Sequence, residues 1–184
     1  MLLTTQRLRL RLLQDKDLDF FHTLHSFPEV DRYNTLGIPV DKAASKLLLD
    51  GLLEELQHEP VKHYPFVIEE GASENPIGII ALRMGSSKFR NGEIWYKISP
   101  DYWGKGNGTE ALRAVLNFAF RDLDLHRITA GCAVDNQGSS RVLEKGGMQR
   151  EGRTRASLPL KTGWSDGYNY AILQSDWRKL NHND

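Results

Sequence analysis

Apolar and polar residues alternate along several short stretches of the chain, with the period of two that is typical of half-buried strands. Leu8, Leu10 and Leu12 alternate with arginines, which predicts a strand over residues 7–13. Polar turns separate the next three runs, so we expect those three to form an antiparallel meander. The further strand-like runs lie at 64–69, 76–84, 92–99, 126–134, 148–157 and 168–173.

Other stretches place apolar residues at the spacing of a helix. Leu18, Phe21 and Leu24 predict a first helix. Asp41 is positioned to cap a second helix that runs to about Gln57. A third helix follows a glycine-rich loop, and a short fourth helix ends at a pair of glycines. Their residues are Leu112, Val115, Leu116, Ala119 and Leu123 for the third helix, and 140–145 for the fourth.

The predicted order of elements is β-α-α-β-β-β-α-β-α-β-β, which places the chain in the α/β class with a mixed sheet. The strand 92–99, the glycine loop, the third helix and the strand 126–134 form one crossover unit. A crossover joins parallel strands, so we expect these two strands to be parallel neighbours.

The composition is that of an ordinary globular protein and excludes several classes of function. The 184 residues are enough for one domain, which we assign to 1–184. Lys plus Arg and Asp plus Glu both number 24, so no net charge attracts nucleic acid or an anionic membrane. No apolar run has membrane-spanning length. Cys132 is the single cysteine, which together with the lack of a secretory signal predicts a cytoplasmic protein.

The most informative motif is the loop that carries Gly104, Gly106 and Gly108 directly before the third helix. A glycine turn that opens a helix exposes several backbone N–H groups at the positive end of the helix dipole, which favours a phosphate. The spacing Gly106-x-Gly108-x-x-Ala111 also fits a dinucleotide fingerprint. The loop lies about a hundred residues into the chain and five residues after its strand, which argues against that fingerprint. A purely structural turn is the other alternative.

The second motif runs from Asn136 through Ser139 and follows the strand 126–134. Taken alone, Asn136 is explained as a helix N-cap and Ser139 as a residue of the first helical turn. The two motifs together indicate a ligand-binding site, because each follows one of two adjacent parallel strands. Ligands of such sheets bind at the carboxyl ends of the strands.

These residues resemble the GNAT superfamily of N-acetyltransferases, and within it the branch of the ribosomal-protein alanine and serine N-acetyltransferases (RimJ/RimL-like). The resemblance covers nearly the whole chain, and its strongest parts are the two motifs at this spacing. Trp103 stands where the superfamily usually has Gln or Arg, and Trp95 stands where this branch usually has Gly. The implied fold is a mostly antiparallel sheet of about six to seven strands with flanking helices. Its central parallel pair is splayed to receive acetyl-CoA.

The resemblance also implies roles for individual residues. Ser139 would stabilise or protonate the leaving thiolate, and Asn136 would bond the pantetheine amide. Glu93 is our candidate for the base that accepts the amine proton, with Asp166 as a weaker one and a solvated strand residue as the alternative for Glu93. The backbone that would contact the cofactor comprises Ile98, Ser99 and Pro100 beside the pantetheine and thioester, and Gly104, Lys105, Gly106, Asn107, Gly108 and Thr109 beside the pyrophosphate.

The implied reaction is direct acetyl transfer from acetyl-CoA to a primary amine, and a protein or peptide α-amine is the first expectation. A small amine such as an antibiotic, polyamine or amino acid is an alternative, as is a non-catalytic acyl-CoA-binding protein. We expect no metal, because His22 and His25 lack companion ligands and are interpreted as surface residues. Cys132 is expected to pack in the core. The chain is expected to be a monomer or a homodimer.

Overall fold

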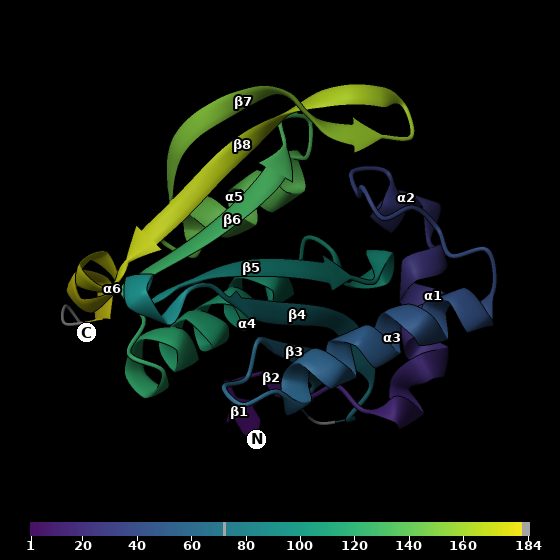
Figure 1. The fold of residues 1–184 in the computed structure, drawn as a ribbon, viewed down its shortest axis with the longest axis horizontal. Coiled ribbons are helices and arrows are strands. Elements are labelled where there is room, and N and C mark those ends of the chain that lie inside the picture. Colours follow the sequence, from purple (N-terminus) through teal and green to yellow (C-terminus); the bar gives the residue numbers. More distant parts are fainter. Residues whose placement is uncertain (72, 182–184) are drawn as a thin grey trace.

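The computed structural model describes residues 1–71 and 73–181 and has an eight-stranded sheet with helices on both faces (Figure 1). The strands are β1 (Leu2–Thr4), β2 (Leu8–Leu12), β3 (His63–Glu70), β4 (Pro76–Met84), β5 (Asn91–Ile98), β6 (Arg127–Ala133), β7 (Gln149–Leu160) and β8 (Gly163–Leu173). The helices are α1 (Leu18–Ser26), α2 (Pro28–Asp31), α3 (Lys42–Gln57), α4 (Asn107–Asn117), α5 (Gln137–Lys145) and α6 (Gln174–Asn181). A π-helical turn, Phe118–Asp122, continues α4.

The strand order is β1-β2-β3-β4-β5-β6-β8-β7. Every neighbouring pair is antiparallel except β5 and β6, which are parallel as the crossover predicted. The α/β class, the meander and the central parallel pair are therefore confirmed. The sheet has eight strands where about six to seven were expected. The additional strand is β1, whose three residues are too few to display an alternation.

Three other differences have local causes. A further short helix, α2, follows the first one and begins at Pro28, because proline fits the first position of a helix. The tail of the chain forms α6, which the buried Trp177 anchors to the body of the protein. Strand β8 begins at Gly163 instead of 168, since a hairpin joins it to the end of β7.

The caps that the sequence suggested are confirmed. The Asp41 carboxylate accepts a hydrogen bond from the Ala44 backbone N–H at 2.7 Å at the start of α3. The side-chain oxygen of Asn136 accepts one from the Ser139 backbone N–H at 3.0 Å at the start of α5. Gly147 has a φ of 95° just after α5, the left-handed conformation that glycine adopts without strain.

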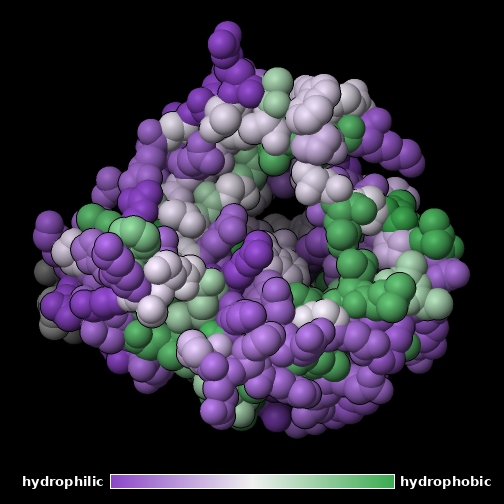
Figure 2. Space-filling model, viewed as in Figure 1, coloured by the Kyte–Doolittle hydropathy of each residue, from purple (hydrophilic) through white to green (hydrophobic). Residues whose placement is uncertain are grey.

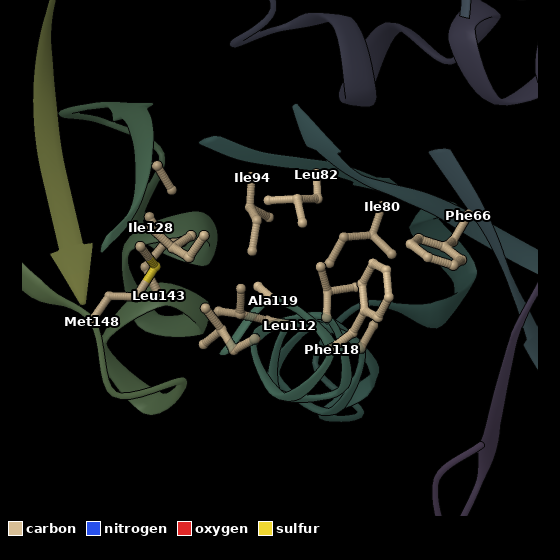
Figure 3. Close-up of a cluster of buried hydrophobic side chains, with 14 of the residues drawn as sticks. Phe66, Ile80, Leu82, Ile94, Leu112, Phe118, Ala119, Ile128, Leu143 and Met148 are labelled. Atoms are coloured by element: carbon tan, nitrogen blue, oxygen red, sulfur yellow. The ribbon is translucent and has the colours of Figure 1, made fainter. Parts of the chain in front are cut away.

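The sheet separates two hydrophobic clusters. One lies against α4 and α5, where Ile80, Leu82 and Ile94 face Leu112 and Phe118 (Figure 3). The other lies under α1 and α3, and its buried members are Leu13, Phe21, Leu24, Leu49, Val67 and Ile79, with Trp95 packed against them. Successive side chains of a strand point to opposite faces. Strand β5 therefore directs Ile94, Tyr96 and Ile98 to the α4 side, and Glu93, Trp95 and Lys97 to the α1 side.

Candidate active site

The two parallel strands form a fork. The two strands pair at three positions only: Asn91 with Arg127, Gly92 with Ile128 and Glu93 with Thr129. Beyond these pairs both strands continue, but they are no longer paired with each other. Figure 1 shows β5 and β6 diverging, with α1 and α2 beyond the open end. Figure 2, in the same view, shows a hollow in this face between the β7–β8 arm and the part of the molecule below it.

The backbone of β5 offers hydrogen-bonding groups to the open side of the fork. The Ser99 N–H donates to the carbonyl of Ile77, a residue of β4, at 2.8 Å. In an antiparallel ladder such bonds alternate, so the N–H groups of Ile98 and Tyr96 point away from β4, toward the gap that β6 leaves. Pro100 has no N–H. Of Ile98, Ser99 and Pro100, only Ile98 therefore presents an N–H donor to the fork, so Ile98 is the residue whose N–H we expect to polarise the thioester carbonyl.

Trp103, which stands where the superfamily usually has Gln or Arg, links the glycine loop to β5. Its indole Nε1 donates to the Ile98 carbonyl at 2.7 Å, which holds the end of β5 against the start of the glycine loop. The ring itself is half exposed, with 49% of its surface accessible.

The glycine loop opens α4 as the sequence indicated, and its glycines are needed for different structural reasons. Gly104 and Gly106 have φ values of 71° and 83°, in the left-handed region. Gly106 is the N-cap of α4, so the N–H groups of the first helical turn, which include Asn107 and Thr109, point outward as at any helix start. Gly108 has a packing role. A Cβ atom there would lie 3.2 Å from Val142 and 3.3 Å from Ile98.

Side chains fasten the loop from within. The Asn107 amide donates to the Tyr102 carbonyl at 3.2 Å, and Asn107 is only 6% exposed. The Lys105 ammonium lies 5.2 Å from the centroid of the Tyr102 ring, so Lys105 contributes a positive charge at the loop. This arrangement gives an anion both backbone donors and a cation at the positive end of α4.

A second support of the loop was not found by sequence reasoning. Arg7 donates through Nε and Nη2 to Glu110 at 2.7 and 2.6 Å, and through Nη1 to the Lys105 carbonyl at 3.0 Å. The Thr5 hydroxyl donates to the same carboxylate at 2.6 Å. Although burial opposes ionisation, these bonds lower the pKa of Glu110. The β1–β2 turn thus fixes the glycine loop, and no spacing within the sequence signals a contact between residues 7 and 110.

The second motif lies on the β6 side of the fork. Asn136 uses its side-chain oxygen as the N-cap of α5, which leaves its NH₂ group as a donor. The Ser139 hydroxyl lies 2.8 Å from the Tyr96 hydroxyl, which also donates to the Ser139 carbonyl at 3.2 Å. Burial raises the pKa of Tyr96, so its hydroxyl keeps its proton. Tyr96 was missed by sequence reasoning, although the alternation of β5 already placed it on the α4 face.

The two base candidates differ in their surroundings. Glu93 is exposed and occupies the last paired position of the fork, opposite Arg83 of β4 and Thr129 of β6. Asp166 accepts from the Ala156 N–H at 2.8 Å and from Arg153 Nε at 2.7 Å. These two bonds lower the pKa of Asp166. They also give Asp166 a structural role, because Ala156 lies in the bulge of β7 between Thr154 and Leu158. Asp166 is therefore a poor proton acceptor, and Glu93 stays the predicted base.

Trp95 is fixed in place on the α1 side of β5. Its indole Nε1 donates to His63 Nε2 at 3.0 Å, and His63 Nδ1 lies 2.8 Å from the Glu55 carboxylate. These contacts assign the imidazole proton to Nδ1. Burial lowers the pKa of His63, against the effect of Glu55, so the imidazole is neutral at physiological pH. These hydrogen bonds therefore fix the orientation of the Trp95 indole on this face of β5.

The remaining candidates are largely structural. Cys132 is buried as expected, and burial raises the pKa of its thiol. The interpretation of His25 as a surface residue is wrong: it is 3% exposed and its Nδ1 donates to the Phe21 carbonyl at 2.8 Å. Within residues 1–71 and 73–181, no group of three or more His, Cys, Asp or Glu side chains is arranged to hold a metal ion.

A forked parallel pair beside an anion-binding helix start defines a class of protein. The gap between β5 and β6 presents the Ile98 N–H to a strand-like amide chain, and the α4 loop presents donors to a phosphate. A ligand with both features, an amide-containing arm that ends in a pyrophosphate, is coenzyme A. The class is therefore that of the transferases which use an acyl-coenzyme A thioester.

The chain belongs to the GNAT family of acetyltransferases. The family model "Acetyltransferase (GNAT) domain" matches residues 7–149. YnaD of Bacillus subtilis (strain 168), named as an uncharacterized N-acetyltransferase, is 30% identical over 95% of this chain and 98% of its own length. The uS5-alanine N-acetyltransferase of Escherichia coli (strain K12) is 27% identical over 95% of this chain and 92% of its own length.

A solved structure supports the same assignment. The crystal structure of spermidine N-acetyltransferase from Vibrio cholerae in complex with CoA and spermine has a TM-score of 0.83 and 26% identity, over 95% of this chain and 99% of that one. The chain is thus an N-acetyltransferase that uses acetyl-CoA. None of the helices in the described ranges combines the length and the hydropathy needed to cross a bilayer.

Proposed function

We propose that the chain transfers the acetyl group of acetyl-CoA to the α-amino group of a protein or peptide. The relatives include enzymes named for a ribosomal protein and for spermidine, so the acceptor has to be argued from the residues of this chain. The observation that carries the proposal is the charge of the β7 strand beside the hollow. Strand β7 carries three exposed arginines, Arg150, Arg153 and Arg155, and one acidic residue, Glu151. Glu151 is paired with Arg127 and Arg153 with Asp166, so the excess positive charge of the strand comes from Arg150 and Arg155. A basic wall repels a polyamine.

The cofactor contacts follow from the site. In this proposal the N–H groups around Gly104, Gly106 and Thr109 bind the pyrophosphate, and the Asn136 NH₂ bonds a pantetheine amide. The Ile98 N–H donates to the thioester carbonyl, where one preorganised donor contributes about 3 kcal/mol to the lowering of the barrier. Bound acetyl-CoA supplies the activated acetyl group.

Proton transfer completes the reaction. The amine nitrogen forms a bond to the acetyl carbon as the bond between that carbon and sulfur breaks. Glu93, directly or through one water, accepts the proton that the amine loses. Ser139 donates a proton to the departing thiolate and regains one from solvent. The Tyr96 hydroxyl, 2.8 Å away, keeps its proton and orients the Ser139 hydroxyl. The cofactor approaches from the α4 side, and the amine approaches from the α1 side, which Glu93 faces.

We predict that an α-amine is a better acceptor than a lysine side chain. An α-amine titrates near ~8 and a lysine near ~10.4, so a larger share of the α-amine is neutral at physiological pH and can attack with the help of a weak base. The test is a peptide that carries both groups, incubated with acetyl-CoA and mapped by fragment mass spectrometry. Acetylation mainly on the lysine side chain would contradict the proposal. Acetylation of neither group, with acetylation of a small amine, would replace it with the small-amine alternative.

A further inference from the structure

Two side chains of opposite charge, Lys97 and Asp31, place buried polar atoms on the acceptor side of β5 without a hydrogen bond between them. Lys97 follows Tyr96 in β5 and faces the α1 side, opposite Ile79 of the second hydrophobic cluster. Asp31 ends α2 and is only 6% exposed. The Lys97 Nζ and the Asp31 Oδ1 are both buried, and neither has a hydrogen-bond partner among the described residues.

The two groups are close enough for the charge of Asp31 to act on Lys97, although they do not form an ion pair within the described part of the chain. Burial lowers the pKa of Lys97 to about 8, and the charge of Asp31 opposes that shift. The charge of Lys97 in turn contributes to the lowered pKa of His25, after the larger effect of burial. A buried charge that lacks a partner is costly, so such a group calls for an explanation, and a role in binding a ligand is one that the position of this pair supports.

The position of Lys97 relates this pair to the reacting atoms. Lys97 directly precedes Ile98, whose N–H points into the fork. Its side chain projects from the sheet face that carries α1 and α2, the face from which the amine approaches in the proposed function. The side chain therefore meets the part of the acceptor next to its amine. Asp31 is the last residue of α2, a helix of a single turn, and its charge acts on the same Lys97 ammonium.

We propose that Lys97 and Asp31 are the specificity pair of the acceptor site and select an amine that carries a peptide group on the neighbouring carbon. The Lys97 ammonium donates to the carbonyl oxygen beside the α-amine, and the Asp31 carboxylate accepts from the next peptide N–H. A peptide group offers one acceptor and one donor, which matches this pair. A polyamine offers further ammonium groups, which the buried Lys97 cation repels. This inference rests on the proposed function and narrows it to an acceptor class.

The experiment compares Lys97→Met and Asp31→Asn with the wild type on three acceptors: an alanine-initiated tripeptide amide, n-butylamine and spermidine. Both substitutions nearly conserve side-chain size. We expect the wild type to prefer the tripeptide. In each variant kcat/KM for the tripeptide should fall by about tenfold, mainly through KM, while kcat/KM for n-butylamine changes less than twofold. Lys97→Met should also raise kcat/KM for spermidine.

Two controls separate recognition from folding. Glu29→Gln changes an exposed carboxylate of the same helix α2 and should leave all three acceptors unchanged. Coenzyme A affinity, measured by calorimetry, should be the same in every variant. Tripeptide kinetics unchanged in both Lys97→Met and Asp31→Asn, with an active wild type, would overturn the specificity pair and leave the proposed function standing. A wild type that prefers spermidine to the tripeptide would overturn both.

Discussion

Replacing Ser139 with alanine is expected to lower turnover on the order of 10²-fold, the effect typical of a lost general acid, while the affinity for acetyl-CoA changes little. The hydroxyl is bonded to Tyr96, and the N-cap of α5 uses the backbone N–H of Ser139, so the substitution removes the proton donor and keeps the cap. Steady-state release of the thiol product measures kcat, and calorimetry measures binding. Tyr96→Phe should give a smaller decrease in kcat, because it removes only the hydroxyl that orients Ser139.

Ser140→Ala is the matched control for this prediction. Ser140 is the next residue of α5, and its hydroxyl lies 3.4 Å from the Cys132 sulfur, outside the proposed cofactor contacts. Its turnover should stay within about twofold of the wild type. If Ser139→Ala and Ser140→Ala turn over equally fast, Ser139 has no part in proton transfer and is only a residue of the helix.

Substitution of the loop glycines is expected to weaken coenzyme A binding by well over tenfold, which corresponds to about 1.4 kcal/mol or more. Valine at Gly106 must adopt a φ of 83° and brings its Cβ to 3.3 Å from Arg7 Nη2. Valine at Gly108 crowds Val142 and Ile98, so it moves the helix start away from the fork. Isothermal titration calorimetry with coenzyme A gives the affinity of each variant directly.

Gly37→Val separates loss of the site from general backbone strain. Gly37 has a φ of 81°, nearly that of Gly106, and a Cβ atom there meets nothing within 4 Å. This variant should bear similar strain and bind coenzyme A as the wild type does. Unchanged affinity in both Gly106→Val and Gly108→Val would remove the loop from the cofactor site.

The parts of the site that the sequence predicted are those carried by local signals. The sequence predicted the glycine turn before one helix and the Asn136 cap of another. Both could be predicted because the chemistry of turns and caps depends on a few neighbouring residues. The parallel pair was predicted for a similar reason, since a crossover of this length has one common topology. The resemblance then supplied roles for Ser139 and Glu93, which stay predictions.

The parts that the sequence did not predict depend on tertiary placement. Arg7 and Glu110 are separated by more than a hundred residues, and only the folded sheet brings the β1–β2 turn to the glycine loop. In the sequence Lys97 resembles any polar residue of an alternating strand, and only the folded structure shows that its Nζ is buried. His25 was misjudged because a helix of nine residues with histidines three apart gives no indication of which one faces the sheet.

The central claim is that coenzyme A lies in the fork between β5 and β6 with its pyrophosphate on the α4 loop. Amide ¹H–¹⁵N NMR of the labelled chain, titrated with coenzyme A, tests it most directly because each backbone N–H reports for itself. We predict that the signals of Ile98, Gly106 and Thr109 shift and become protected from solvent exchange, while those of α3, on the opposite face of the sheet, stay unchanged. Saturable binding that leaves the Ile98 and Gly106 signals in place and moves those of α3 would contradict the account.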